Sequence, residues 1–452
     1  MSQSARVDTG TALALLLSAG SLLIVTCAGG QQTSQTPNVT SAAFAGASNA
    51  GQPAVSPVAA SAFPESLPPE DTAEAAGSQP LAAFWEQIRQ LQEHQRREHV
   101  RVLWLGDSHT AADFWVHPVR KLLGDVTGSG GPGYLQVGLG GYRHGAARVE
   151  STGKWGMEPR APSYFVGPQG DATFGLAGVR TVPKPGAEAT IKVHQKALQG
   201  GVQWQVLYRL PKAGSRFRLR LEPGETLEVT AEVGAALDAG VRRVALQSDA
   251  SAVLHIDQVQ GAPELFGVIA EGSEPGIVID TLGINGARVA TPLTWDHAHF
   301  VAQVKQRNPA LVVLAYGTNE IGDALAPWRY AAQYDALLAR LRDAVPKVAC
   351  LILGPPDRAL PDWSGDPREV EIEQVQRQVA NQHGCGFFSM IDAMGGPGSV
   401  QRWAFASPPL ARKDRVHLTP QGYETLGDAL GRSLLAGRPS TTATAVTGDA
   451  RR

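Results

Sequence analysis

The stretch that decides the fold is Val100-Arg-Val-Leu-Trp-Leu-Gly-Asp-Ser-His-Thr110. Residues 100–105 form a short apolar run without polar alternation, which is typical of a strand buried on both faces of a sheet. The run ends at Gly106-Asp107-Ser108, and residues 111–123 then have the character of a helix. Ser108 is therefore expected at the carboxyl end of a buried strand, where open α/β sheets place their ligands.

The flanking sequence indicates the rest of a parallel sheet. Upstream, apolar residues at helical spacing predict an amphipathic helix over 81–97. Downstream, strand-like runs alternate with helical stretches, and this alternation predicts a parallel α/β sheet. The segments are Gly276–Asp280, Trp295–Arg307, Ala310–Ala315, Tyr330–Ala344 and Lys347–Leu353.

A different pattern fills the interval between the two halves of this sheet. Short segments alternate apolar and polar residues and are separated by Pro- and Gly-containing turns, a spacing that suits an antiparallel β-sandwich. The expected strands are Val202–Leu210, Arg216–Glu222, Thr226–Val233, Arg242–Gln247 and Ala252–Val259. We therefore predict an α/β domain in two parts, 81–150 and 271–437, with a β-sandwich inserted at 151–270. Trp155, Trp204 and Tyr208 of the insertion are each either core residues or platforms for sugar rings.

Both ends of the chain are expected to lack a packed core. Arg6 precedes an apolar stretch of signal-peptide length, so residues 1–27 read as an export signal. Cys27 stands where a bacterial lipoprotein signal places its lipidated cysteine, and it is a candidate site of lipidation. Residues 28–80 read as a flexible linker and 438–452 as a disordered tail, because neither holds enough large apolar side chains to offset the entropy of ordering.

The bulk composition excludes some classes of partner. A net charge of −2 over 452 residues offers no electrostatic reason to bind nucleic acid, and it leaves the N-terminal signal or lipid anchor as the only membrane contact. No cysteine and histidine spacing suggests a metal site, and no organic cofactor is expected. Cys350 and Cys385 are either buried free thiols or, in an oxidising compartment, a disulfide.

A second block of residues supplies the chemistry that a serine nucleophile needs. Asp414-Arg-Val-His417 lies just before a helix expected to begin near Pro420. A histidine titrates in the range required to take a proton from a serine hydroxyl, and a carboxylate on its other ring nitrogen orients it. Taken alone, this spacing is equally that of a surface loop, and Ser108 is equally a helix cap.

Two further blocks follow predicted strands. Gly286, in Gly283-Ile-Asn-Gly-Ala287, allows backbone to approach a substrate closely and donate an N–H group. Asn319, in Tyr316-Gly-Thr-Asn-Glu320, can donate its side-chain N–H group to an oxyanion. Either residue is by itself also an ordinary turn former.

Together and in this order, the four blocks resemble those of the SGNH, or GDSL-like, hydrolase superfamily. The resemblance implies a flavodoxin-like three-layer α/β/α fold. It also implies Ser108 as nucleophile, His417 as base and Asp414 as the group that orients it. The oxyanion hole would consist of the Ser108 and Gly286 N–H groups and the Asn319 side chain.

Further segments resemble the peptidoglycan O-acetylesterase (Ape-like) group within that superfamily. They are Trp104–Asp113, Gly131–Tyr134, Gly141–His144, Asp392–Gly396 and Trp403. Proteins of that group similarly carry a sandwich resembling a carbohydrate-binding module between the Ser and Gly blocks. His109 replaces the leucine of GDSL, and it is a candidate for contact with the substrate as well as a structural residue at a helix start.

The function expected from these resemblances is that of an exported serine esterase in the bacterial periplasm or cell envelope. Its partner would be an O-acetylated polysaccharide, above all peptidoglycan, from which it removes O-acetyl groups through an acyl-enzyme on Ser108. Two alternatives stay open: a glycan O-acetyltransferase with the same triad, and a catalytically inactive glycan-binding surface protein.

Overall fold

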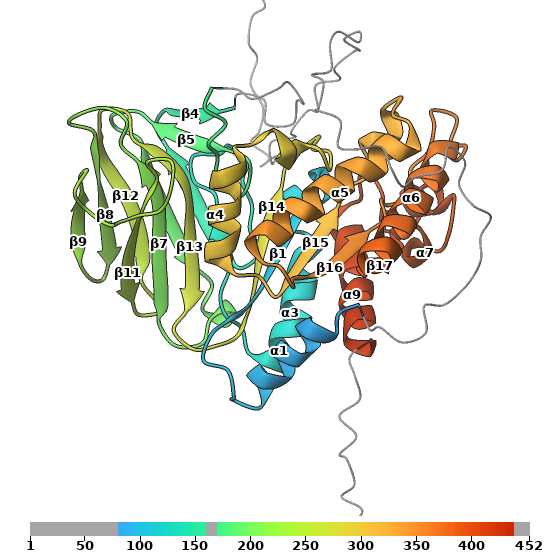
Figure 1. Cartoon of the computed structure of the whole chain (residues 1–452), viewed down its shortest axis with the longest axis horizontal. Helices are drawn as coiled ribbons and strands as arrows, with labels where there is room; N and C mark the ends of the chain where they lie inside the picture. Colours follow the sequence, from blue (N-terminus) through green and yellow to red (C-terminus); the bar gives the residue numbers. More distant parts are fainter. Residues whose placement is uncertain (1–79, 160–169, 438–452) are drawn as a thin grey trace, which may run out of the picture. The chain divides into compact units, whose positions relative to one another are not determined.

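The strand that leads to Ser108 lies inside a five-stranded parallel sheet in a computed structural model of the chain. In spatial order the strands are β14 (Ile277–Gly283), β1 (Val100–Gly106), β15 (Leu311–Ala315), β16 (Ala349–Leu353) and β17 (Gly386–Phe388) (Figure 1). Numbered within this sheet alone, the order is 2-1-3-4-5, which is that of flavodoxin-like folds. The predicted fold class is therefore confirmed, and the order of strands changes direction next to β1.

The structure describes residues 80–159 and 170–437, all of which belong to one compact unit of the chain. The predicted signal segment 1–27 with Cys27, the linker except for its last residue, and the tail 438–452 lie outside the described residues. Within these residues, no helix is long and apolar enough to cross a membrane.

Helices cover both faces of the sheet, because successive side chains of β1 point to opposite sides. Leu103 and Leu105 pack into one hydrophobic core with α4, α5 and α6, and Val102 and Trp104 pack into another with α1, α3 and α9. The helices are α1 (Ala82–Gln92), α2 (Ser108–Ala111), α3 (Val116–Thr127), α4 (His297–Arg307), α5 (Pro327–Ala344), α6 (Pro367–His383), α7 (Met390–Met394), α8 (Ser399–Ala404) and α9 (Pro420–Ala436). The result is the expected three-layer arrangement.

The first helix is shorter than the sequence predicts. It ends at Gln92 rather than at residue 97, and His94 has a left-handed φ of 56°. The N–H groups of Gln95 and Arg96 both donate to the carbonyl of Gln90, which closes the last turn of the helix. Apolar periodicity continues too weakly beyond this point to hold the helix, and the chain turns towards β1.

The insertion consists of two antiparallel sheets. One has the order β10-β11-β7-β13-β5-β4, with β2 added to β13, and the other has the order β3-β6-β12-β8-β9 (Figure 1). Their bounds are β2 (Gly133–Leu135), β3 (Ala147–Thr152), β4 (Trp155–Glu158), β5 (Arg180–Pro183), β6 (Glu188–Val193), β7 (Val202–Arg209), β8 (Arg216–Glu222), β9 (Thr226–Val229), β10 (Ala235–Ala236), β11 (Arg242–Ser248), β12 (Val253–Gln260) and β13 (Glu264–Gly272). The sheets thus extend beyond the predicted range 151–270 at both ends.

Two of the three aromatic residues considered in the insertion belong to its core. Trp204 and Tyr208 are fully buried between the two sheets. Trp155 is half-buried, and its indole N–H donates to the carbonyl of Thr152. Alternation along β7 faces Trp204 and Tyr208 to the same side, and that side is the core.

A buried charge cluster joins the insertion to the parallel sheet. Glu271, on β13, accepts from Arg101 of β1 at 2.8 Å and pairs with Arg307 of α4 at 2.8 Å. Arg307 also donates to Asp280 of β14 at 2.8 and 2.9 Å. Burial alone would raise the pKa of Glu271, but the guanidinium groups of Arg307 and Arg101 hold it well below its usual range.

The two cysteines of the hydrolase domain form a disulfide. Cys350 lies in β16 and Cys385 directly precedes β17, and their Cα atoms are 4.7 Å apart. Parallel pairing of these two strands brings the cysteines together. The sequence left this pairing open, because it does not show which strands are neighbours.

Candidate active site

Three strand ends meet where Ser108 begins helix α2. Gly106, the last residue of β1, is in register with Gly283 of β14 and with Ala315 of β15. A Cβ atom on Gly106 would lie 2.9 Å from the carbonyl oxygen of Ala315, so only glycine fits between the strands. Asp107 caps the helix, accepting from the His109 N–H group at 3.0 Å, as its position predicts.

The structure brings Ser108, His417 and Asp414 into one chain of hydrogen-bonding distances. Ser108 Oγ lies 3.0 Å from His417 Nε2, and His417 Nδ1 lies 3.1 Å from Asp414 Oδ2. The residues come from opposite ends of the hydrolase domain, 309 positions apart for the serine and the histidine. This is the arrangement in which an imidazole can take the proton of a serine hydroxyl while a carboxylate orients the ring.

The loop that holds the imidazole is anchored by its own backbone. We call residues 412–417 the DxxH loop. The Arg412 N–H donates to the His417 carbonyl at 2.7 Å, and Asp414 Oδ1 accepts from the N–H groups of Val416 and His417 at 3.0 and 2.8 Å. Burial alone would raise the pKa of Asp414, but the His417 ring and these two N–H groups hold it well below its usual range. Asp414 is thus a carboxylate at neutral pH.

The two other predicted site residues lie on loops that follow the neighbouring strands. The Gly286 loop follows β14 and is fixed next to β1, because the Ile284 N–H donates to the Gly106 carbonyl at 3.0 Å. Gly286 itself has a φ of +76°, in the region that favours glycine. Asn319 follows β15, and its side-chain nitrogen donates to the Ala287 carbonyl at 2.9 Å. An amide nitrogen carries two protons, so one remains after this bond.

Glu320 is a positioning residue that the sequence did not reveal. Its side chain is fully buried and accepts from the Val289 N–H at 2.8 Å and from the Gly317 N–H at 3.1 Å. It therefore ties the Gly286 loop to the Asn319 loop, and burial raises its pKa to about 7. The sequence signal was only an acidic residue next to Asn319, which also fits a helix cap.

His109 lies against His417, the residue of the DxxH loop that contacts Ser108. Its ring centroid is 5.3 Å from that of His417, and its Nδ1 lies 2.8 Å from the Tyr423 hydroxyl. The side chain is only 3% exposed, and burial, with the neighbouring His417, lowers its pKa to about 3. A neutral, enclosed imidazole is poorly placed to contact a substrate, so the geometry favours the structural alternative for this residue.

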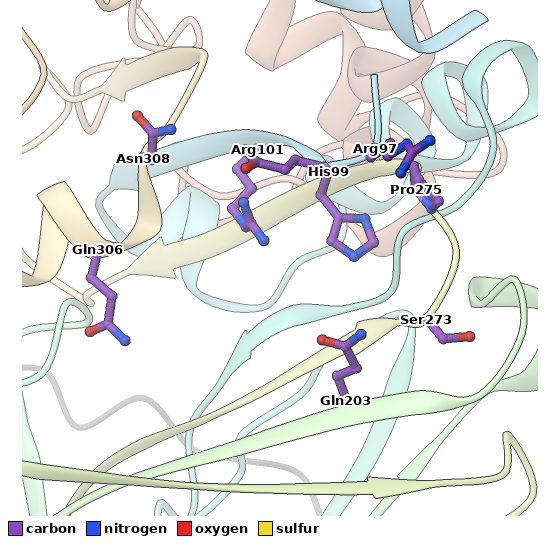
Figure 2. A pocket seen from close by; sticks show the side chains of 9 residues that line it. Arg97, His99, Arg101, Gln203, Ser273, Pro275, Gln306 and Asn308 are labelled. Atoms are coloured by element: carbon purple, nitrogen blue, oxygen red, sulfur yellow. The ribbon is translucent and has the colours of Figure 1, made fainter. Parts of the chain in front are cut away.

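A hollow lies at the other end of the central sheet, away from Ser108. It has a volume of about 400 Å³ and is lined by polar side chains that include Arg97, His99 and Arg101, as Figure 2 shows. These residues precede or begin β1, whereas Ser108 follows its end. The hollow is therefore separate from the site around Ser108. Among the described residues, no group of three or more acidic, histidine or cysteine side chains is placed to hold a metal ion.

Part of the chain matches a known protein family. Residues 257–425 match the family model described as the GDSL-like Lipase/Acylhydrolase family, a segment that contains Gly286, Asn319, Asp414 and His417. No curated protein matches the chain.

One solved structure has a similar fold over most of the chain, and others resemble it more weakly. A peptidoglycan O-acetylesterase superposes with a TM-score of 0.67 at 24% identity, covering 80% of this chain and 98% of that one. An acetyl xylan esterase has a TM-score of 0.28 at 16% identity and covers 35% of this chain and 81% of that one. A family two carbohydrate esterase from Cellvibrio japonicus has a TM-score of 0.28 at 10% identity and covers 65% of this chain and 98% of that one.

The family match over residues 257–425 and the order of the parallel sheet support an acyl hydrolase of the SGNH, or GDSL-like, type. Its fold, over most of the chain, is that of a peptidoglycan O-acetylesterase with a sheet-rich insertion.

Proposed function

We propose that this enzyme is an exported serine esterase that removes O-acetyl groups from a glycan, most specifically peptidoglycan. The observation that carries the proposal is the continuous chain from Ser108 Oγ through His417 to Asp414. The fold shared with a peptidoglycan O-acetylesterase supports the choice of substrate.

The proposed reaction has two halves. Ser108 Oγ attacks the acetyl carbonyl while His417 Nε2 takes the hydroxyl proton. The oxyanion is stabilised by the N–H groups of Ser108 and Gly286 and by the second N–H of the Asn319 side-chain amide. The bond to the sugar oxygen then breaks, His417 returns the proton to that oxygen, and an acetyl-serine remains. Water, deprotonated by His417, attacks this ester, and acetate leaves as Ser108 recovers its proton.

The Cys350–Cys385 disulfide supports the export part of the proposal. Structural disulfides persist in oxidising compartments such as the bacterial periplasm. With the signal assigned to residues 1–27, we place the enzyme in the periplasm or cell envelope, held at the membrane through the N-terminal signal or through a lipid on Cys27. Labelling of expressed protein with a radioactive fatty acid, compared with Cys27→Ser, tests the lipid anchor.

Mass spectrometry of O-acetylated peptidoglycan and of acetylated xylan after incubation with purified protein tests the substrate. We expect acetyl groups to be lost from peptidoglycan and retained on xylan. Ser108→Ala should abolish this loss and the turnover of p-nitrophenyl acetate. Unchanged turnover by Ser108→Ala would refute the assignment of the nucleophile.

The same assay separates the alternatives. An O-acetyltransferase would move the acetyl group to an added glycan acceptor and release little acetate without one. An inactive glycan-binding protein would bind peptidoglycan and hydrolyse neither ester.

A further inference from the structure

Two aromatic rings stand beside the DxxH loop and are not part of the site described above. Phe405, directly after α8, is 60% exposed, and Trp363, in the loop between β16 and α6, is half-buried. Their ring centroids are 5.2 Å apart with an angle of 60° between the planes. The exposed part of the Phe405 ring is available for contact with a ligand.

Cations from the DxxH loop lie over both rings. Lys413 Nζ is 3.3 Å from the centroid of Phe405, and the Arg415 guanidinium carbon is 5.9 Å from that of Trp363. These two residues are the immediate chain neighbours of Asp414. We call Trp363, Phe405, Lys413 and Arg415 the aromatic platform, and it adjoins the candidate catalytic residues through continuous backbone.

The backbone holds the platform in an unusual conformation. Trp363 and Arg415 have φ angles of 68° and 66°, in the left-handed region that bulky residues rarely adopt. The Ala359 N–H donates to the Arg415 carbonyl at 3.1 Å, so the Trp363 loop is bonded to the DxxH loop. Residues in this conformation persist only where the surroundings over-determine them, so the two loops hold each other in place.

The distribution of exposed apolar side chains singles out this surface. Within the part of the chain that the structure describes, the large hydrophobic residues that are exposed are Val126, Trp328, Val370 and Phe405. None of them is in the β-sandwich. Of the two aromatic side chains among them, Phe405 at 60% is more exposed than Trp328 at 48%, and Phe405 lies beside the DxxH loop.

We propose that the aromatic platform is a subsite for a sugar ring of the substrate that carries a carboxylate on the ring or on a substituent. The proposal rests on the proposed glycan esterase function. A pyranose ring presents an apolar C–H face that packs on the exposed part of an aromatic ring. Because Lys413 and Arg415 lie over the rings of Phe405 and Trp363, they place positive charge beside a sugar bound there.

The local charges agree with an acidic ligand. Of the carboxylates on the two loops, Asp414 is engaged by His417, and Asp366 lies 3.8 Å from Arg358. Asp357 is buried and accepts from the N–H groups of Gly398 and Val400. Asp362 accepts from the Ser364 hydroxyl and N–H groups. Lys413 and Arg415 have no acidic partner among the ion pairs of the described residues, so a substrate carboxylate would be their counter-ion.

The subsite predicts a selective effect on polymer turnover. Holding a neighbouring sugar on the platform aligns the acetyl ester with Ser108, and a small ester gains nothing from it. Phe405→Ala should lower the ratio of kcat/KM for O-acetylated peptidoglycan to kcat/KM for p-nitrophenyl acetate about tenfold, which corresponds to the loss of one stacking contact. Because Phe405 is exposed, this variant should fold, which circular dichroism checks.

Lys413→Gln tests the charge. It should lower the preference for peptidoglycan, which carries carboxylates, over acetylated xylan, which is neutral, by about threefold to tenfold. The matched control is Val126→Ala, another exposed apolar residue, which lies in the last turn of α3. It should leave both ratios unchanged.

The outcomes separate this proposal from the proposed function. If Ser108→Ala abolishes deacetylation but Phe405→Ala leaves the polymer-to-ester ratio within twofold of wild type, the function stands and the subsite is wrong. If Lys413→Gln leaves the preference for the acidic polymer unchanged, the carboxylate part is wrong. Persisting activity of Ser108→Ala would instead overturn the esterase mechanism itself.

Discussion

Asp414 binds two different groups with its two oxygens. Oδ2 faces the ring of His417, whereas Oδ1 accepts from the backbone N–H groups that shape the DxxH loop. The residue therefore has a structural role in the loop and, in our proposal, a positioning role for the imidazole. A substitution that keeps one oxygen separates the two.

Asp414→Asn is that substitution. The asparagine oxygen can still accept from both N–H groups, but its amide nitrogen would face His417 Nδ1 and favour the wrong tautomer. We expect kcat for p-nitrophenyl acetate to fall by roughly 10³-fold or more, with unfolding free energy changed by less than about 1 kcal/mol. Asp428→Asn, on the solvent-facing side of α9, is the control, with kcat near wild type. A value for Asp414→Asn within tenfold of wild type would contradict the assignment.

At the scale of elements, Glu271 connects three of them. It lies on β13 and binds Arg101 of β1 and Arg307 of α4 in a buried cluster. Glu271→Ala would leave two guanidinium groups without this partner, and we expect a loss of about 3–5 kcal/mol in unfolding free energy. Urea unfolding followed by circular dichroism measures it.

The control for this change is Glu150→Ala, because Glu150 pairs with Arg148 on the exposed face of β3. Its loss should cost less than about 1 kcal/mol. Since the insertion and the parallel sheet share a hydrophobic core, Glu271→Ala should still unfold in one transition. Equal destabilisation by the two variants would show that the cluster does not stabilise the junction.

The disulfide joins two neighbouring elements of the sheet. It closes a segment of 35 residues between Cys350 and Cys385, for which the loop-entropy relation gives a stabilisation of about 3–4 kcal/mol. The double variant Cys350→Ser, Cys385→Ser should therefore melt at a lower temperature than wild type. A reductant should lower the melting temperature of wild type and leave that of the double variant unchanged. If a reductant left the melting temperature of wild type unchanged, even after the protein had been unfolded in its presence, the result would argue against the bond.

Across the whole molecule, several buried carboxyl groups should make stability depend on pH. Burial, with the neighbouring Asp357 charge, raises the pKa of Glu369 from 4.5 to about 9. The folded chain then keeps this proton up to about pH 9, whereas the unfolded chain releases it near pH 4.5. The stability that the protonated group supplies is complete below pH 4.5 and is lost as pH rises towards 9.

Glu369→Gln should remove this contribution. The amide can still accept from the Arg358 N–H, which donates to Glu369 at 2.9 Å, and it carries no charge at any pH. The quantity to compare is the melting temperature of the variant minus that of wild type. We expect this difference to be more positive at pH 8.5 than at pH 5. Glu371→Gln, on a more exposed side of the same helix, is the control. An identical difference at both pH values would contradict the prediction.

Local pattern was enough for much of the fold. The apolar run before Ser108, the later strand and helix alternation and the β-pattern between them correspond to β1, to β14–β16 with α4 and α5, and to the sandwich strands. Such patterns report burial on one or both faces, which is a property of a segment and its near neighbours. They are less exact at ends, as the early end of α1 shows.

The candidate site could be predicted from the sequence for a related reason. Ser108, Gly286 and Asn319 each follow a strand, and parallel strands bring their carboxyl ends to one edge. Glu320, the Glu271 cluster and the pairing of Trp363 with Phe405 were not predicted. Each depends on contacts between distant segments for which no local pattern exists.

The sequence by itself determined the kind of elements, the order of the four blocks and the chemistry that their side chains can perform. The tertiary structure alone decided that Cys350 bonds to Cys385, that Trp204 and Tyr208 are core residues, and that His109 is enclosed. The physical reason is that local preferences act within a few residues, whereas burial and pairing depend on which segments the folded chain brings together.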